Sequence, residues 1–567
     1  MRREILKGNP FFLSDEDIAW VENTLGGMTE KEKIGQLFFL VGYTNDGAYL
    51  DHISRELQVG GMMCRVMGAA DVVGAVTRLQ ENSKIPMLIS ANLEAGGNGI
   101  VKEGTKIGAQ MAVAATGESR YAYELGSICA QQAKSVGANY AFAPVTDIDF
   151  NFRNPITNTR TYGSDPETVL EMCRAYVRGC QEQGVAVSVK HFPGDGVDER
   201  DQHLLTSVNS LSCGEWDSTY GRIYKTLIED GAKTVMVGHI MQPAYSRALC
   251  PGIRDEEILP ASLSRELLGG LLREKLGFNG LIITDATTMT GMTAAMPRDR
   301  AVPYAIAAGC DMFLFTKNLE EDVRFMFEGL ESGILSRERL DEAVTRILAL
   351  KASLGLHRRS NIPSLEAAMP VLSSQHAQQI AREVADRSIT LVKRQEGVLP
   401  LDTSRIKRVL LYDIESGENA LGYGREIGLA QQFGALLEQE GLEVTHFTAG
   451  ERFEGRQVSF REITSEFDLM IYLANLATKS NQTTVRIEWM NPMGINCPIY
   501  THTVPTIFIS VENPYHLLDV PHIKTFINCY SCNAYTLPLL ADKLFGRSEF
   551  TGKSPVDPFC GKWDTRL

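Results

Sequence analysis

The stretch GLIITDATTM, residues 280–289, places a short apolar run directly before the carboxylate of Asp285. Leu281–Thr284 has the length and the apolar content of a buried strand. Seven comparable runs, each followed by a segment able to form a helix, are Gln36–Val41, Gly60–Arg65, Pro86–Ala91, Asn139–Ala143, Val185–Val189, Thr234–Val237 and Met312–Phe315. Eight strands that alternate with helices over roughly 320 residues predict a (β/α)8 barrel better than an open sheet.

Polar side chains follow most of the predicted strands, at the carboxyl ends where barrels of this kind carry their chemistry. In strand order from the third to the eighth they are Asn92 and Glu94; Asp147, Asp149 and then Arg160; Lys190 and His191; His239; Asp285; and Lys317. The sequence therefore predicts a functional site at this end of the barrel. Because loops are polar in any case, the enrichment alone does not say what the site binds.

A second domain is predicted after the barrel. Residues 334–356 have apolar positions at helical spacing with Gly355 near the end, and a polar stretch follows. Five further strand-like runs among helices are Val409–Tyr412, Val444–Phe447, Leu469–Leu473, Thr506–Val511 and Thr525–Tyr530. We expect a catalytic barrel over residues 1–357, a linker over 358–375 and a smaller C-terminal α/β sandwich domain over 376–567.

Composition narrows the class of partner. The 567 residues carry a net charge of 56 − 70 = −14 and no basic run interleaved with aromatic residues, so nucleic acid is not an expected partner. No stretch approaches the roughly 20 apolar residues that span a bilayer, and MRREILKGNPFFL at the N-terminus lacks the apolar core of a signal peptide. Eleven scattered cysteines do not indicate a disulfide framework. We expect a cytoplasmic protein without a cofactor.

Asp285 is the first candidate for catalysis. A carboxylate at the mouth of an apolar strand can act as a nucleophile, a base or a metal ligand. It can equally cap the following helix, for which aspartate is a favoured residue. Its position does not decide between these roles.

The loop KHFPGDGVDERDQH, residues 190–203, ends on Asp201-Gln202-His203. Histidine can give and take a proton near neutral pH, and a carboxylate two residues away can fix its tautomer and stabilise the imidazolium. The alternative is a solvated loop in which the aspartate and the histidine are incidental.

The same strand ends offer two other kinds of site, one for a metal ion and one for a hydroxyl-rich or anionic ligand. Asp195, Asp201, His203 and Asp285 could in principle bind a divalent ion, but no HxH follows the first strand and no HExxH occurs, so no metal site is expected. Lys190 and His191, joined by Arg160, offer more donors than the neighbouring loops offer acceptors. Such a cluster suits hydroxyl-rich or anionic ligands, unless these residues are solvated loop cations.

The motifs resemble glycoside hydrolase family 3, in particular its β-N-acetylglucosaminidase branch. Lys190–Gly194 is similar to the KHFPG element, Asp201-Gln202-His203 to the D-x-H of that branch, and Ile283–Asp285 with Met289 to the nucleophile segment. The stretch RTYGSDP, residues 160–166, resembles RxFGxDP. Residues 388–401, SITLVKRQEGVLPL, and 545–556, FGRSEFTGKSPV, resemble the start and end of the family's C-terminal sandwich, so the resemblance covers nearly the whole chain.

The resemblance implies a retaining mechanism through a covalent glycosyl-enzyme. Asp285 would attack the anomeric carbon, and His203, supported by Asp201, would serve as general acid and then general base. The same resemblance implies that Arg160, Lys190, His191 and Asn92 bind the sugar. Two positions depart from the family pattern: Asn92 replaces the acid of DQEGGR, whose later arginine is also missing, and Asp195 replaces the second histidine of KHFPGHG.

The leading hypothesis from the sequence is an exo-acting β-N-acetylhexosaminidase that releases terminal N-acetylglucosamine from a small carbohydrate. A muropeptide, as in cell-wall recycling, chitobiose and a glycoprotein fragment are all open as the substrate. A β-N-acetylglucosaminide phosphorylase is the alternative, because a histidine that has given up its proton is neutral and repels an anionic acceptor less than a carboxylate would. A β-glucosidase is less favoured, because we find no convincing acid glutamate in the second domain. A catalytically inactive amino-sugar-binding protein is the hypothesis of a different class.

Overall fold

The structure is a computed structural model, described here for residues 2–42, 44–358, 360–415, 428–448, 459–478, 480–490 and 494–567. Its contacts divide the chain into two compact units. The first comprises Met1–Lys106, Ala122–Asn154 and Pro166–Gln378; the second comprises Ile107–Tyr121, Pro155–Asp165 and Gln379–Leu567. No helix in the described ranges is both long and apolar enough to cross a membrane. The domain boundaries predicted from the sequence stay predictions.

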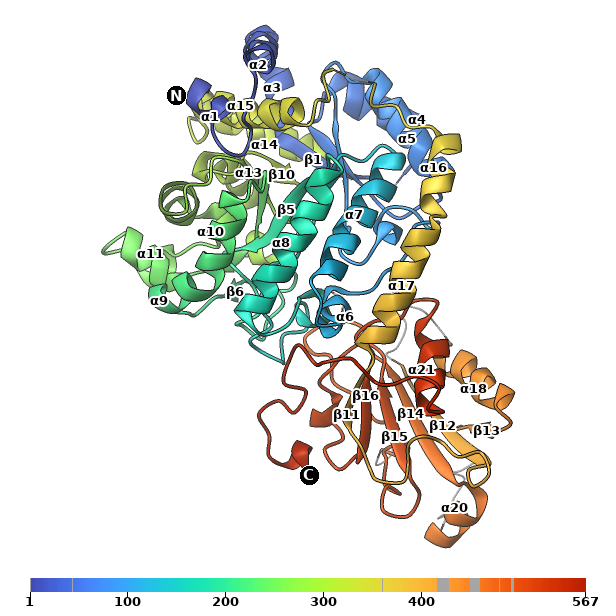
Figure 1. Cartoon of the computed structure of the whole chain (residues 1–567). Helices are drawn as coiled ribbons and strands as arrows, with labels where there is room; N and C mark the ends of the chain where they lie inside the picture. The colour runs from blue at the N-terminus through green and yellow to red at the C-terminus, as the bar shows by residue number, and fades with distance from the viewer. Residues whose placement is uncertain are drawn as a thin grey trace. The chain divides into compact units, whose positions relative to one another are not determined.

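The first unit contains the barrel, and the predicted fold class is confirmed. Its eight parallel strands, in the order β10-β1-β2-β3-β4-β5-β7-β9, are surrounded by helices (Figure 1). They are β1 (Phe38–Gly42), β2 (Gly61–Cys64), β3 (Leu88–Ala91), β4 (Tyr140–Ala141), β5 (Ala186–Phe192), β7 (Thr234–Val237), β9 (Leu281–Thr284) and β10 (Phe313–Leu314). A parallel bridge between Ile283 and Met312 joins the two outer strands, so the sheet closes on itself. A short parallel pair, β6 (Ser207–Val208) and β8 (Ile240–Met241), lies outside this sheet.

Three helices precede β1, helices alternate with the strands from there on as the sequence predicts, and the last helix continues into the second unit at Gln379. The helices are α1 (Arg2–Lys7), α2 (Asp15–Gly27), α3 (Glu30–Leu37), α4 (Gly47–Asp51), α5 (Ala69–Asn82), α7 (Arg120–Ser135), α8 (Pro166–Glu182), α9 (Cys213–Trp216), α10 (Arg222–Glu229), α11 (Pro243–Leu249), α12 (Thr290–Thr293), α13 (Arg298–Ala308), α14 (Leu319–Glu331), α15 (Arg337–Ser353), α16 (Leu365–Leu372) and α17 (Gln375–Ser388). Helix α8 shows why they form: proline occupies its first position, and its buried residues recur every three or four positions. The helix predicted over residues 334–356 is observed as α15.

Two buried ionisable groups mark the closing part of the barrel. The carboxylate of Asp311, between α13 and β10, lies 2.7 Å from both Arg273 and Arg339, and it also accepts the backbone N–H of Ile282 in β9 at 2.9 Å. Lys351 of α15 is fully buried, and its Nζ donates to Oε1 of Gln36 at 2.6 Å. Burial beside an uncharged amide partner lowers the pKa of Lys351 to about 7.

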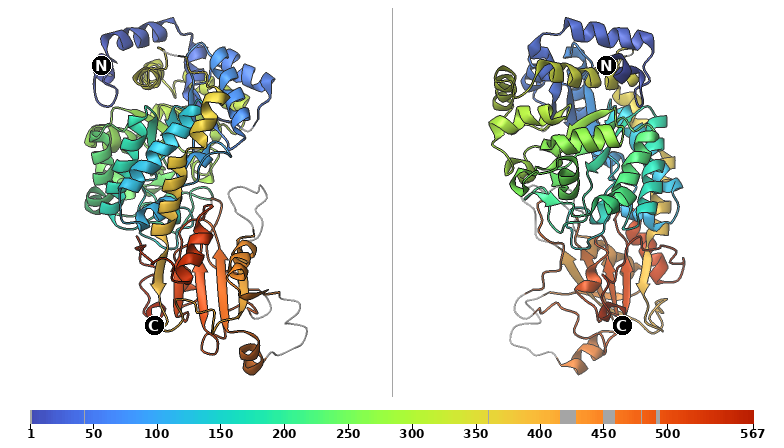
Figure 2. Two further views of the ribbon diagram at one scale, coloured as in Figure 1. Left: turned by 45° about the vertical axis from the view of Figure 1, so that its right-hand side comes forward. Right: turned by 90° about the vertical axis from the view of Figure 1, so that its left-hand side faces the viewer.

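The second unit is a three-layer α/β domain around a six-stranded sheet of order β11-β16-β15-β14-β12-β13 (Figure 2). The strands are β11 (Thr390–Lys393), β12 (Arg408–Glu415), β13 (Glu443–His446), β14 (Leu469–Asn475), β15 (Thr506–Ser510) and β16 (Thr525–Asn528), and the helices are α6 (Gln110–Ala115), α18 (Leu429–Gln439), α20 (Phe460–Glu466) and α21 (Thr536–Leu544). Five strands correspond to predicted runs; β11, antiparallel to β16, was not predicted.

Alternate residues of the central strands face the two layers of helices. Val409 and Leu411 of β12 pack in a cluster with residues of α18 and α21, whereas Leu410 and Tyr412 pack on the opposite face with residues at the end of α20. Two segments from the N-terminal half of the chain also belong to this unit. Lys553 donates its N–H to the carbonyl of Ala115 at 2.9 Å, and Ser164 donates its N–H to the carbonyl of Pro555 at 3.1 Å.

Candidate active site

Asp285 lies directly after β9, at the carboxyl end of the barrel strands. Its backbone N–H donates to the carbonyl of Val237, the last residue of β7, at 2.8 Å, and its Oδ1 accepts the N–H of Ala286 at 2.7 Å. Only 9% of the residue is exposed. Burial by itself would raise the pKa of this carboxyl, but the nearby imidazoles, His191 foremost, outweigh it and lower the pKa below the usual value. Asp285 is therefore held as a carboxylate.

His191 occupies the space between two carboxylates. Its Nδ1 lies 2.7 Å from Oδ2 of Asp147, which follows β4, and its Nε2 lies 3.8 Å from Oδ2 of Asp285. The backbone N–H of His191 also donates to Oδ1 of Asp147 at 3.1 Å. The pairing of β5 with β7 shifts register between Val189 and Phe192, which is the stretch that carries His191. A shift of this kind re-aims the side chains next to it.

Lys190, the neighbour of His191, forms its own buried ion pair. Its Nζ lies 2.7 Å from Oε1 of Glu94, and the side chains are only 3% and 18% exposed. The expectation that these two cations lack matching acceptors is therefore wrong, since Glu94 pairs with Lys190 and Asp147 with His191. The sequence places both acids on the predicted ring but does not say which base each one meets.

Asp201 and His203 form the dyad that the sequence suggested. Nδ1 of His203 lies 2.7 Å from Oδ1 of Asp201, and the same oxygen accepts the backbone N–H of His203 at 2.9 Å. The Asp201 side chain is fully buried, whereas 26% of the His203 side chain is exposed. Because Asp201 engages Nδ1, Nε2 is the nitrogen left to exchange a proton with a ligand.

The turn that carries the dyad is fastened to the segment after Asp285. The N–H of Thr290 donates to the carbonyl of His203, and the N–H of Gly291 donates to the carbonyl of Gln202, both at 3.1 Å. His203 is one of the three imidazoles whose charge lowers the pKa of Asp285. The structure thus brings the predicted acid and the predicted nucleophile to the same end of the barrel.

Gln202 is a buried residue whose role the sequence does not indicate. It is 1% exposed, and its Oε1 accepts the backbone N–H of His239 at 2.7 Å. Its Nε2 lies 3.4 Å from Oδ2 of Asp195, which is itself 2% exposed. Its place between Asp201 and His203 was the available signal, but its partners His239 and Gly291 come from distant parts of the chain.

His239, which follows β7, is fully buried beside Asp285. Its Nδ1 lies 2.7 Å from Oγ of Ser262, and its Nε2 lies 3.0 Å from the carbonyl of Ala286. Burial is the main cause that lowers the pKa of His239. Both ring nitrogens are engaged by the protein, so this imidazole supports the strand end that carries Asp285.

The remaining predicted residues lie in three places. Asn92 follows β3 and is exposed, and Lys317 is exposed after β10. Arg160 ends the helical turn Asn158–Arg160 and belongs to the second compact unit, where its Nη1 donates to the carbonyl of Ile156 at 3.2 Å. No cluster of three or more His, Cys, Asp or Glu residues in the described part of the chain has an arrangement suited to a metal ion.

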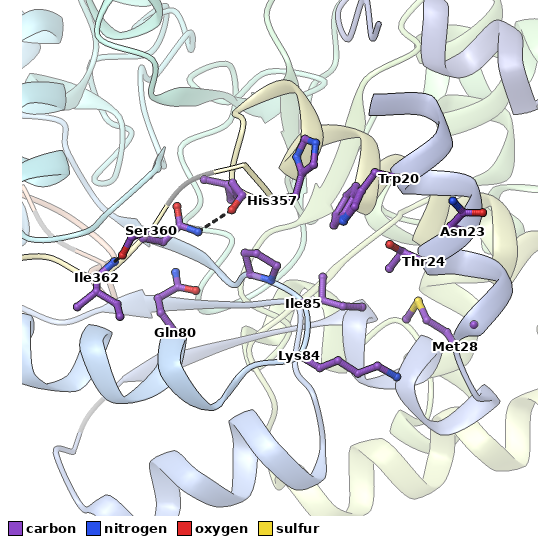
Figure 3. A pocket seen from close by; sticks show the side chains of 14 residues that line it. Trp20, Asn23, Thr24, Met28, Gln80, Lys84, Ile85, His357, Ser360 and Ile362 are labelled. Atoms are coloured by element: carbon purple, nitrogen blue, oxygen red, sulfur yellow. Dashed lines mark hydrogen bonds between the residues drawn. The ribbon is translucent and has the colours of Figure 1, made fainter. Parts of the chain in front are cut away.

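A cavity of about 530 Å³ lies elsewhere in the barrel unit, and none of the predicted site residues lines it. Its walls come from α2, from the residues before β3 and from the segment after α15, with Trp20, Met28 and His357 among the side chains shown in Figure 3. Ile85 and Pro86 line it and precede β3, so it lies at the amino ends of the strands. Size alone does not make it the active site, because the ionisable cluster lies at the carboxyl ends.

The geometry agrees with the chain's similarity to known proteins. Residues 29–350 match the family model described as "Glycosyl hydrolase family 3 N terminal domain". A Cellulomonas fimi protein named beta-N-acetylglucosaminidase/beta-glucosidase is 54% identical over 562 residues, which cover 99% of this chain and all of that protein. The solved structure titled "Beta-glucoside phosphorylase BglX" is 46% identical with a TM-score of 0.94 and covers 100% of both chains. A family 3 beta-N-acetylglucosaminidase from Paenibacillus is 25% identical, with a TM-score of 0.77 over 94% of this chain and 99% of its own.

Proposed function

The chain belongs to glycoside hydrolase family 3, and we propose that it cleaves β-linked N-acetylglucosaminides and glucosides by a double displacement in which inorganic phosphate is the preferred acceptor. The observation that carries the proposal is the Asp201–His203 dyad, an imidazole proton donor at the end of the barrel that carries Asp285.

In the first step Asp285 attacks the anomeric carbon. Its lowered pKa keeps it ionised, and its Oδ2 is the oxygen nearest to His191. His203 gives its proton to the leaving oxygen as the glycosidic bond breaks, which leaves a glycosyl ester on Asp285. Asp201 stabilises the imidazolium before the transfer and holds the ring in orientation.

In the second step an acceptor attacks the same carbon and regenerates Asp285. His203 is then neutral, so a phosphate anion approaches a group without charge, whereas a carboxylate at that position would repel it. The carboxylate that supports His203 is fully buried behind it, and the carboxylates of Glu94 and Asp147 are paired with Lys190 and His191. The similarity of the whole chain to a structure titled as a β-glucoside phosphorylase supports the same choice of acceptor.

The second candidate is the exo-β-N-acetylhexosaminidase predicted from the sequence, with water as the acceptor. The names of the Cellulomonas fimi and Paenibacillus relatives favour it. The two candidate functions share Asp285, His203 and the first step. They differ in the acceptor of the second step: water that His203 deprotonates in the hydrolase, and a phosphate anion beside a neutral His203 in the phosphorylase.

Lys190, His191, Asn92 and Arg160 are proposed to bind the sugar. His191 and Lys190 donate to hydroxyls from positions fixed by their carboxylate partners. Asn92 contributes an uncharged amide where the family pattern has an acid, so its hydrogen bond to the sugar lacks charge assistance. No disulfide joins any of the eleven cysteines, all of which lie in the described residues, and this supports a reducing compartment such as the cytoplasm as the working location.

An inactive sugar-binding protein is the proposal of a different class. It is less well supported, because a pure binding site needs neither an ionised Asp285 nor a histidine backed by a buried carboxylate. Binding of N-acetylglucosamine without turnover of any aryl glycoside would favour it.

The test is a product analysis with and without phosphate. Purified protein is incubated with 4-nitrophenyl N-acetyl-β-D-glucosaminide and with the matching glucoside, and the sugar products are followed by proton and phosphorus NMR. We expect phosphate to accelerate release of nitrophenol and to yield a sugar 1-phosphate that retains the β configuration, because two displacements restore the starting geometry. Free sugar alone at an unchanged rate would establish the hydrolase instead.

The nucleophile is tested in parallel. Asp285→Asn should abolish turnover with either acceptor, whereas Asp255→Asn, a change at an exposed position elsewhere in the barrel unit, should leave it unchanged. A 2-deoxy-2-fluoro glycosyl fluoride should label Asp285, located by mass spectrometry of the digested protein. Labelling of another residue, or near-normal turnover by Asp285→Asn, would reject the assignment.

A further inference from the structure

Gln202 links three segments that meet at the carboxyl end of the barrel. Its carbonyl accepts the N–H of Gly291 in α12, its Oε1 accepts the N–H of His239 after β7, and its Nε2 faces Asp195 in the loop after β5. The residue is almost fully buried although its neighbour His203 is partly exposed. Gln202 is therefore the residue that anchors the turn carrying Asp201 and His203 in the protein interior.

The direction of the Gln202 amide is fixed by the backbone. Since the N–H of His239 can only donate, the atom 2.7 Å from it must be the carbonyl oxygen of the side chain, and the amide nitrogen then points to Asp195. Asp195 is a suitable acceptor there, because its Oδ1 is already occupied by the N–H of Gly196 at 2.7 Å and by Nδ2 of Asn154 at 3.1 Å, while Oδ2 faces Gln202.

Asp195 is itself anchored to the residues around His191. Its backbone N–H donates to Oδ1 of Asp147 at 2.8 Å, and Asp147 also holds the ring of His191. Burial, with the Asp147 carboxylate nearby, raises the pKa of Asp195 to about 8, so near neutral pH the group is uncharged. Because Oδ1 accepts two N–H groups, Oδ2 carries the proton and accepts from Gln202 with a lone pair. One continuous set of contacts thus runs from the sugar-binding end of the loop to its proton-donating end.

We propose that Gln202 is a positioning residue for the reaction: seated on Asp195 and on the N–H of His239, it fixes the turn that presents His203 to the leaving oxygen. The inference rests on the proposed function, because it requires His203 to be the general acid. It also gives the aspartate at position 195 a use, since a hydrogen-bond acceptor is what the Gln202 amide nitrogen needs.

Exchanging the donor and the acceptor tests the contact. In assays at a pH above the pKa of Asp195, where Oδ2 has no proton to donate, Asp195→Asn keeps the Oδ1 contacts but turns an NH₂ group toward the Gln202 NH₂ group, and Gln202→Glu keeps the oxygen for His239 but turns a second oxygen toward Asp195. Each single change should lower kcat/KM by about 10- to 100-fold, because a buried hydrogen-bonding group is left unsatisfied. The double variant restores a donor opposite an acceptor and should recover to within about threefold of the wild type.

The leaving group separates positioning of His203 from general damage. The 2,4-dinitrophenolate of a dinitrophenyl glycoside leaves without a proton from an acid, whereas the phenolate of a phenyl glycoside needs a proton from His203 in order to leave. The single variants should show the loss of about 10- to 100-fold in kcat/KM on the phenyl substrate, and a loss of less than about threefold on the dinitrophenyl substrate. Equal losses on the two substrates, or no recovery in the double variant, would overturn the proposal.

The first control is a glutamine with burial and hydrogen bonds similar to those of Gln202. Gln242 is another buried glutamine that accepts one backbone N–H and donates to one carbonyl, so Gln242→Glu should show no dependence on the leaving group. If Gln202→Glu does not accumulate as folded protein, Gln202→Met removes both contacts at similar volume and is assayed in the same way. His203→Asn is run beside them. If it too lacks the leaving-group pattern, the acid assignment of the proposed function fails; if it alone shows the pattern, only the role of Gln202 fails.

Discussion

Replacing His191 with glutamine should move the acidic limb of the kcat/KM profile to higher pH. Asp285 must be ionised to attack, and His191 is the foremost of the imidazoles that lower its pKa against the effect of burial. When that imidazole is removed, the carboxylate loses an opposing charge and its pKa rises. The activity should therefore begin to fall at a higher pH in the variant than in the wild type.

The size of the shift follows from the geometry. Two opposite unit charges separated by the 3.8 Å between Nε2 of His191 and Oδ2 of Asp285 interact by about 4 kcal/mol at an effective dielectric constant of about 20. This energy corresponds to about 3 pKa units. Asp147 lies 2.7 Å from the other ring nitrogen and offsets part of the positive field. We expect a shift of about 1 to 2 pH units, within the range that one opposite charge produces.

The assay is a pH profile of kcat/KM measured with the aryl glycoside at constant ionic strength. His376→Gln is the control, because His376 is an exposed histidine paired with Glu124 and is not one of the three imidazoles that lower the pKa of Asp285. Its acidic limb should move by less than about 0.5 unit. An acidic limb of His191→Gln that coincides with that of the wild type would refute the electrostatic account of the ionised nucleophile.

Three further outcomes follow from the buried groups. Asp201→Asn should lower kcat/KM on a phenyl glycoside by about 10²- to 10³-fold with a much smaller loss on the dinitrophenyl glycoside; a uniform loss would mean that Asp201 does not act through His203. Because the pKa of Asp195 is raised in the folded protein, only the unfolded chain releases this proton between about pH 4 and 8. In urea titrations from about pH 5 to 7, the unfolding free energy of Asp195→Asn should therefore rise relative to that of the wild type by about 1.4 kcal/mol per pH unit. A difference in unfolding free energy that does not change with pH would contradict this prediction. The lowered pKa of Lys351 has the opposite effect on stability, because above about pH 7 the unfolded chain keeps the proton that the folded protein has released. Wild-type stability should therefore rise relative to Lys351→Met by about 1.4 kcal/mol per unit between pH 7.5 and 9.5 in the same titrations, and parallel curves would show that Lys351 is charged in the fold.

Much of the barrel was predictable because its strands are short apolar runs bounded by polar loops. Thr234–Val237 and Leu281–Thr284 were predicted with the bounds that the structure has. Strand β11 was missed, since an edge strand that pairs on one side needs little apolar sequence and its partner β16 lies far along the chain.

The candidate site was predictable where one residue type carries the chemistry. Asp285 and the Asp201–His203 pair follow from strand position and local spacing, and the structure adds the distances of the dyad. The role of Gln202 was not predictable, because its contacts with His239 and Gly291 depend on how three strand ends meet. The pairing of Lys190 with Glu94 depends in the same way on which strands become neighbours.

The second compact unit is assembled from three separate pieces of the chain, and this limits how the gene can be divided. A single cut between the two halves would leave 107–121 and 155–165 on the fragment that lacks their partners, with the carbonyls of Ala115 and Pro555 deprived of their donors. Arg160 lies in one of those pieces. Expression of the N-terminal half alone would therefore yield a protein whose nucleophile and acid are encoded but whose Arg160 segment has lost its scaffold, so truncation is a poor way to define the minimal enzyme.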